Sequence, residues 1–317
     1  MSTNLDVPAA PALTRAPRVA GDGHGARTAG HSWLGAALLA LAAGVAALSL
    51  LGPLMSAVID YRITDLVLSQ LVGLDAVSLA LVAPLAALAG VLTLRGHALG
   101  PVLALGPATY VAYMVPQYVL GPDYVNLAGN NERFFGLLLA LFVLGVCGAV
   151  SAWAAIDLSR LLMSNARERV VGRVLLPIAA VLVFGRYAPA LADWMSATPS
   201  AKDYLAGPTF GWTIGLLDLG LALPASVAVC IGVRRGARWA RKGLYAIVAW
   251  YALVGSAVAA MAISMYVRDD STMSAAQMAI MSVLGAALVA LFILLHAPLL
   301  RRAQARGSDA NPLRGAA

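Results

Sequence analysis

One arginine lies inside a stretch of sequence that is otherwise apolar. Residues 181–194 read VLVFGRYAPALADW, and Arg186 is near the middle of this run. An isolated guanidinium in hydrocarbon costs from about 3 to more than 10 kcal/mol, and pairing with a carboxylate or contact with water reduces that cost. Arg186 therefore needs a partner, and it marks either a structural ion pair or a polar binding site.

Asp218 is the partner that the spacing favours. We expect Trp194 and Trp212 to lie at the same membrane interface on consecutive helices, as aromatic belts do. Arg186 is eight residues from Trp194, a depth of about 12 Å at 1.5 Å per residue. Asp218 is six residues from Trp212, a depth of about 9 Å by the same rise. We therefore predict an Arg186–Asp218 pair that faces the bundle interior.

Other polar groups can serve the same site. Asp193 is seven residues after Arg186, which places it on the same helical face and nearer to water. Pro189 lacks an N–H, so it frees a backbone carbonyl one turn earlier that a guanidinium can contact. Tyr110 and Tyr113 are neighbours on one face of a proline-containing run, where their hydroxyls can line a cavity. Ordinary aromatic packing is the alternative for the two tyrosines.

Motifs of known chemistry do not occur in the sequence. It has no GxxxxGK[ST], HExxH, GxSxG or EF-hand pattern. Cys147 and Cys230 lie in apolar runs without a CxxC partner. We predict no catalytic residue, no metal site and no cofactor.

Composition indicates the elements that must position these residues. The chain has 317 residues, of which 61% are hydrophobic and only 12% are charged. Soluble domains are about 25% charged. So little charge cannot cover a soluble globule, whereas a membrane protein needs no such cover. The sequence therefore predicts an all-α polytopic membrane protein.

Eight apolar runs are each near the roughly 20 residues that cross a bilayer. They predict a bundle of eight transmembrane helices at about 33–59, 76–94, 98–120, 134–156, 174–195, 211–233, 243–267 and 274–299. We predict a disordered cytoplasmic tail at 1–31, a membrane domain at 32–300 and a disordered basic cytoplasmic tail at 301–317. Residues 61–73 place Ile63, Leu66, Val67 and Leu71 on one helical face, which predicts a short helix lying on the outer surface.

Basic residues alternate from one loop to the next. Most of them fall in both tails, at Arg95 and in loops 157–173 and 234–242. This positive-inside pattern predicts a protein of the cell membrane with both termini in the cytoplasm. The same pattern explains the net charge of +7, because the basic loops set the orientation of the protein in the membrane. The charge therefore does not indicate binding to nucleic acid. The predicted partners are the lipid bilayer and, at the basic loops, anionic lipid.

Two segments are similar to each other. The distance from Pro84 to Arg95 equals that from Pro224 to Arg235, and both segments lie in spans of the same direction. This similarity suggests a parallel repeat of four plus four helices.

These observations favour a transporter or permease-like protein with a polar site between helices, acting on a small molecule or ion. The alternative is a structural or accessory subunit, and the sequence leaves both homo- and hetero-oligomers open. A lipid-modifying enzyme is the weakest candidate, because it needs clustered acid and base groups. Only Asp60, Asp65 and Asp75, near Tyr61 and Arg62, provide such a density.

Overall fold

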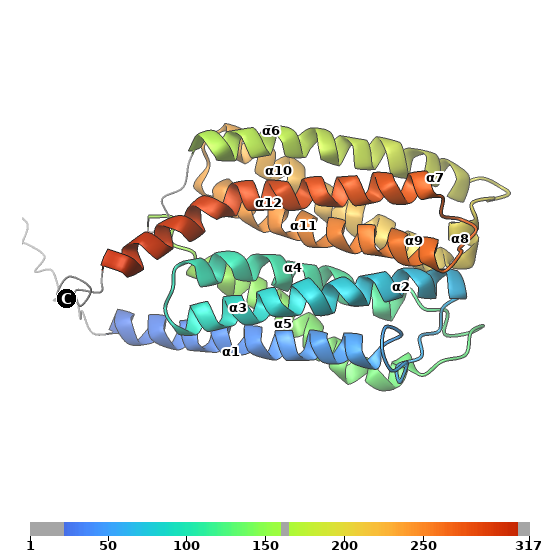
Figure 1. The fold of residues 1–317 in the computed structure, drawn as a ribbon, viewed down its shortest axis with the longest axis horizontal. Coiled ribbons are helices and arrows are strands. Elements are labelled where there is room, and N and C mark those ends of the chain that lie inside the picture. Colours follow the sequence, from blue (N-terminus) through green and yellow to red (C-terminus); the bar gives the residue numbers. More distant parts are fainter. Residues whose placement is uncertain (1–21, 160–164, 310–317) are drawn as a thin grey trace, which may run out of the picture.

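The computed structural model describes residues 22–159 and 165–309, and in this part of the chain all regular structure is helical. The helices run side by side in two groups (Figure 1). The first group contains α1 (Asp22–Leu51), α2 (Asp65–Val77), α3 (Ala83–Leu94), α4 (Leu99–Leu120) and α5 (Phe135–Ala155). The second contains α6 (Asn165–Val181), α7 (Ala188–Trp194), α8 (Lys202–Ala206), α9 (Pro208–Leu217), α10 (Leu223–Arg234), α11 (Arg238–Val267) and α12 (Ala275–Asp309).

Seven helical segments in the described residues are long and apolar enough to cross a membrane. They are Gly30–Leu51, Asp65–Leu94, Leu99–Leu120, Asn131–Ala155, Pro208–Arg234, Arg238–Val267 and Ala275–Leu299. The predicted span 174–195 is not among them. It corresponds to the end of α6, a π-helical turn η3 (Leu182–Tyr187) and α7, a path that begins among charged residues. This path still runs the length of the second group (Figure 1).

The ends of the spans differ from the predicted ones. Helix α1 begins at Asp22 and α12 ends at Asp309, so helical structure extends into both predicted tails, because elongation of a formed helix is favourable. Residues 1–21 and 310–317 of those tails lie outside the described residues. The prediction of a surface helix at 61–73 was wrong. Helix α2 continues without a break into α3, and its buried residues include Ser69 and Asp75 beside Val67 and Leu71.

Three helical paths in the described residues contain a π-helical turn followed by proline. The turns are η1 (Ser78–Val82), η3 and η4 (Asp218–Ala222), and the prolines are Pro84, Pro189 and Pro224. Proline has no N–H to donate to the carbonyl four residues earlier, and that carbonyl lies in the π turn in each case. The hydrogen-bond ladder shifts instead to a spacing of five residues. Such a turn changes the direction in which nearby side chains point.

Helix α11 joins the two groups. It packs on α10 and α12 in its own group and on α2 and α4 in the other. The backbones approach closely at Gly73 of α2, where a Cβ would lie 2.4 Å from the carbonyl oxygen of Ala260. At the end of the bundle near the termini, α6 is tied to α11, since Arg241 Nε donates to Glu168 Oε2 at 2.7 Å. The Glu168 side chain is only 3% exposed.

The segments that are similar in sequence also have the same local geometry. Two residues after the end of helix α3 stands Gly96 with φ +68°, and two residues after the end of α10 stands Gly236 with φ +72°. Gly96 N donates to the carbonyl of Thr93, and Gly236 N donates to that of Val233. Each segment thus runs from a π turn through a proline and a short helix to a left-handed glycine.

Candidate functional site

A cavity of about 320 Å³ lies between the two groups of helices. Residues of α2, α4, α6, η3, α9, η4, α10, α11 and α12 line it. Its polar lining consists of Gln70, Tyr110, Tyr113, Gln117, Arg186, Tyr187, Asp218 and Tyr251. The volume is at the lower end of the range for small-molecule sites, about 300–1,000 Å³.

Asp218 is the carboxylate of this cavity. It is the first residue of η4, ten residues from one end of the span Pro208–Arg234. The Tyr113 hydroxyl donates to Asp218 Oδ1 at 2.6 Å, and the Tyr187 hydroxyl donates to Oδ2. Each tyrosine ring is buried, whereas Asp218 is half-buried. Two hydroxyl donors from different helices therefore hold the carboxylate in the cavity wall.

Arg186 reaches the same cavity without binding Asp218 directly. Among the described residues, no ion pair within 4.0 Å joins Arg186 to Asp218, whereas such pairs do join Arg62 to Glu132 and Arg241 to Glu168. The reason is Tyr187, which follows Arg186 in η3. Its hydroxyl occupies a carboxylate oxygen, and the Arg186 guanidinium carbon lies 5.5 Å from the centroid of its ring. This separation fits a cation–π contact.

The two predicted tyrosines of α4 have different partners. Tyr113 faces Asp218, and its ring meets Trp250 edge-on at a centroid distance of 5.0 Å. Tyr110 also lines the cavity, but its hydroxyl lies 3.2 Å from Ser78 Oγ in the first group. Tyr110 thus connects the cavity wall to the interior of the first group.

Asp193 lies outside the cavity lining, which corrects its predicted place beside Arg186. Its carboxylate accepts hydrogen bonds from Ser200 N at 3.0 Å, Ser200 Oγ at 2.8 Å and Ala201 N at 3.0 Å. These groups belong to the turn before α8, where backbone N–H groups have no helical acceptor. Asp193 therefore closes a loop at the end of the bundle.

Sequence reasoning missed several members of the site. Tyr187, Trp250 and Tyr251 line the cavity, and Trp250 contacts Tyr251 at a centroid distance of 4.8 Å. The only sequence signal for Tyr187 was its position next to Arg186. Trp250 and Tyr251 are adjacent in the apolar run of α11. In such a run the sequence does not distinguish an aromatic residue at the membrane interface from one in the core or at a cavity.

The acidic residues of an enzymatic cluster do not converge. Asp60 and Asp65 are exposed, whereas Asp75 is 0% exposed inside the first group. Within the described ranges, no three His, Cys, Asp or Glu side chains gather in a geometry that could hold a metal ion.

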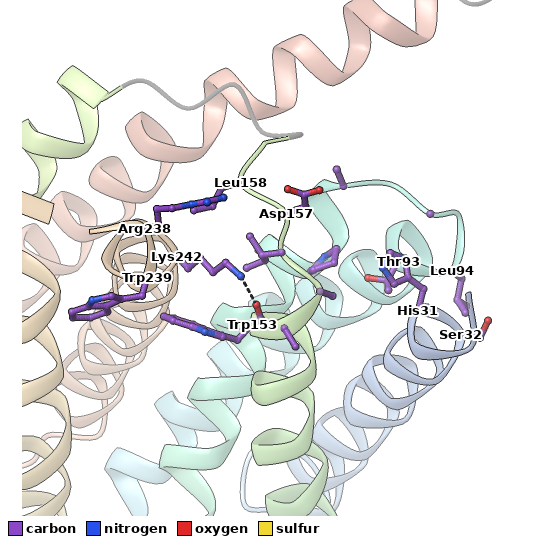
Figure 2. A pocket seen from close by; sticks show the side chains of 16 residues that line it. His31, Ser32, Thr93, Leu94, Trp153, Asp157, Leu158, Arg238, Trp239 and Lys242 are labelled. Carbon is purple, nitrogen blue, oxygen red and sulfur yellow. Dashed lines mark hydrogen bonds between the residues drawn. The ribbon is translucent and has the colours of Figure 1, made fainter. Parts of the chain in front are cut away.

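A second cavity of about 850 Å³ lies at the end of the bundle near the termini. Figure 2 shows Arg238, Trp239 and Lys242 of α11 on one side of it and Thr93 and His31 on the other. Lys242 Nζ donates to the carbonyl of Trp153 at 3.0 Å. Tryptophan and basic side chains at helix ends are typical of a membrane interface.

Comparisons with protein-family models, with curated proteins and with solved structures find no match to this chain. The class of protein therefore follows from the chain's own features. The seven apolar helices of spanning length found in residues 22–159 and 165–309 define a multi-pass membrane protein.

Proposed function

We propose that this protein is a permease-like transporter of a small molecule or ion, with its substrate site at Asp218. The observation that carries the proposal is the carboxylate held by Tyr113 and Tyr187 in a cavity between two helix groups. Ionisable groups deep in membrane spans are costly, and those that face a cavity mark substrate and ion pathways.

The proposal includes eight crossings in a parallel four-plus-four repeat. The path α6–η3–α7 extends along the whole second group, from the end near the termini to the opposite end (Figure 1). In the repeat, this path corresponds to α1, and the helix α9–η4–α10 corresponds to α2–η1–α3. The matching π turns, prolines and left-handed glycines support the correspondence. Repeat transporters place their sites between the halves, at discontinuous helices.

We propose that the end of the bundle near the termini faces the cytoplasm of a cell membrane. The turns that carry Arg95 and Arg235 lie at this end, with the first described turn of α1 and the last of α12 (Figure 1). The positive-inside rule assigns such turns to the cytoplasmic side.

The lining indicates a substrate with a positively charged group. A carboxylate accepts about four hydrogen bonds, and two tyrosines take two of those positions at Asp218. The rings of Tyr113, Tyr187 and Trp250 can contact a cation through their faces. Arg186 can meet a carboxylate of the same molecule, so zwitterions are within the class.

Uptake into proteoliposomes tests the proposal. Radiolabelled choline, glycine betaine and glycine serve as the cationic and zwitterionic probes. We expect protein-dependent uptake of at least one probe, and a loss of at least tenfold in D218N, which keeps the shape of the side chain. D193N is the matched control, because Asp193 bonds only its own loop.

Equal uptake by folded D218N and by the parent protein would overturn the role of Asp218. The absence of uptake of all three probes by a protein with a sharp unfolding transition would favour the second candidate, a structural or accessory subunit. A stable homo- or hetero-oligomer on purification would support that second candidate.

We also propose that the cavity of Figure 2 holds the head group of an anionic lipid, because Arg238 and Lys242 line it beside Trp153 and Trp239. Phosphatidylglycerol is expected to raise the unfolding temperature of the detergent-solubilised protein more than phosphatidylcholine. R238Q should reduce the difference between the two lipids. An equal response to both lipids would contradict this proposal.

A further inference from the structure

Three buried polar atoms without a hydrogen-bond partner lie near the end of α1. They are Ser49 Oγ, Tyr61 OH and Asp75 Oδ2, in side chains that are 1%, 3% and 0% exposed. An unpartnered buried polar group costs about 1–3 kcal/mol. Among the described residues only one other side chain, His296, has such an atom. Three of these atoms in one region indicate that something binds there.

Two of the three groups, Ser49 and Asp75, line one small space, and Tyr61 stacks on a residue of its lining, Tyr118. Ser49 and Asp75 line a cavity of about 10 Å³, which is close to the volume that one water-sized sphere requires. The Tyr118 hydroxyl donates to Asp75 Oδ1 at 3.1 Å, and the Tyr61 ring stacks on Tyr118 at 5.2 Å. Burial, with a smaller contribution from Asp75, raises the pKa of Tyr61, so its hydroxyl stays neutral.

The charge of Asp75 has no compensating cation in this space. The lining contains no Arg, Lys or His; besides Ser49, Asp75 and Tyr118, it includes Ser78 and Tyr110. A Cβ on Gly52 would lie 2.6 Å from Asp75 Oδ2 and 3.0 Å from the carbonyl oxygen of Leu48. Asp75 Oδ2 therefore lies against the last turn of α1, where the helix dipole is negative. This environment disfavours a free carboxylate and favours a bound positive ion.

We propose that Asp75, Ser49 and Tyr61 bind one sodium ion at the end of α1. Carboxylate, hydroxyl and carbonyl oxygens are hard ligands that suit such an ion. One carboxylate neutralises one positive charge, whereas divalent ions in proteins usually take more carboxylates or keep several waters. The cavity has room for one small ion and no hydration shell.

This sodium site goes beyond the proposed transport function and does not depend on it. The cavity at Asp218 is larger and lies between the groups, whereas the Asp75 site lies within the first group. Sodium binding can therefore be measured without any substrate, and failure of uptake at Asp218 leaves the sodium site standing.

The test is the unfolding temperature of the purified full-length protein in detergent at one fixed pH. Sodium, lithium, potassium and N-methyl-D-glucamine chlorides are compared at constant ionic strength. A ligand that binds only the folded state raises stability with the logarithm of its concentration above Kd. We expect sodium to raise the unfolding temperature in this way, with smaller effects of potassium and N-methyl-D-glucamine.

Variants assign the effect to the site. D75N, which keeps an oxygen acceptor for Tyr118, should abolish the sodium-dependent shift. S49A and Y61F should move the shift to higher sodium concentrations by about tenfold, and they keep the proposal testable if D75N does not fold. D65N is the control, because Asp65 is an exposed carboxylate on the same helix.

The same unfolding temperature in all four salts would overturn the proposal. A sodium effect that persists unchanged in D75N, S49A and Y61F would overturn it as well, because the ion would then bind elsewhere. A larger response to potassium than to sodium would also contradict the assignment.

Discussion

At the scale of single residues, two carboxylates in this protein have different surroundings. Asp218 accepts one tyrosine hydroxyl on each oxygen and borders a cavity of about 320 Å³. Asp75 accepts one tyrosine hydroxyl on a single oxygen and is enclosed. Each carboxylate thus accepts a hydrogen bond from a tyrosine of α4. Tyr113 donates to Asp218, and Tyr118 donates to Asp75. The position of α4 therefore determines the geometry of both carboxylates.

The bond from Tyr113 to Asp218 gives a prediction about stability. Hydrogen bonds to a charged group contribute about 1.5–3 kcal/mol in soluble proteins, and interhelical bonds in membranes average less, about 0.6 kcal/mol. We expect Y113F to reduce the free energy of unfolding by about 1–2 kcal/mol, and by clearly less in a D218N background. A double-mutant cycle by thermal or denaturant unfolding measures the difference. An equal cost of Y113F in both backgrounds would show that the loss of the hydroxyl is independent of the Asp218 carboxylate.

At the scale of helices, close backbone contacts and one ion pair hold the bundle together. Gly73 lets α2 lie against the backbone of α11, and Arg241 ties α11 to α6. The π turns η3 and η4 bring Arg186, Tyr187 and Asp218 to one cavity. Packing thus joins the two helix groups, while the irregular turns shape the site between them.

The Gly73 contact predicts a large effect of one methyl group. A Cβ at Gly73 would lie 2.4 Å from both the carbonyl oxygen of Ala260 and the amide of Met261, so backbone must move. We expect G73A to lower the free energy of unfolding by about 1–3 kcal/mol. G136A is the matched control, because nothing lies within 4 Å of a Cβ there and alanine is the better helix former. A neutral G73A would contradict the close approach of α2 and α11.

The pair at Glu168 predicts strong coupling between α6 and α11. R241Q leaves a carboxylate that is 3% exposed without its bidentate partner. Breaking a buried pair costs about 3–5 kcal/mol, and the Arg241 side chain is 25% exposed, so we expect about 3 kcal/mol. Thermal unfolding of R241Q, E168Q and the double variant measures it. The double variant should recover part of the loss, and no recovery would show that the two residues act independently.

At the scale of the whole molecule, our proposal of eight crossings requires that both ends of the helical bundle's chain path lie on the same side of the membrane. Both described ends lie at one end of the bundle, together with the α3–α4 and α10–α11 turns (Figure 1). In the part of the chain that the structure describes, seven segments have the length and composition of spans, and the path α6–η3–α7 is the eighth in our proposal. An even number of crossings is what returns the chain to the side on which it began.

Cysteine labelling tests this topology. In a background without Cys147 and Cys230, we expect V125C and A197C to react with a membrane-impermeant maleimide on intact cells. R235C should react only after the membrane is opened. All three positions are exposed in the structure. Labelling of V125C without A197C would show that α6–η3–α7 does not cross, and labelling of R235C on intact cells would reverse the orientation.

The sequence alone determined the class of protein and the approximate positions of most spans, and it singled out four residues that line the candidate cavity. Hydropathy predicts these features because burial in lipid depends on the composition of each segment and not on its neighbours. The distances in sequence from Trp194 to Arg186 and from Trp212 to Asp218 predict similar depths for the two charged residues. Both residues line the same cavity in the structure.

Tertiary structure decided which polar groups meet. The sequence predicts that Arg186 contacts Asp218, whereas in the structure the Tyr187 hydroxyl donates to Asp218. The reason is that the π turn η3 changes the direction of its side chains. Asp75 reads as a loop charge in the sequence, yet it lies inside the first group beside Tyr118. The direction of a side chain and the partner across the interface depend on how helices pack, and local sequence does not contain that information.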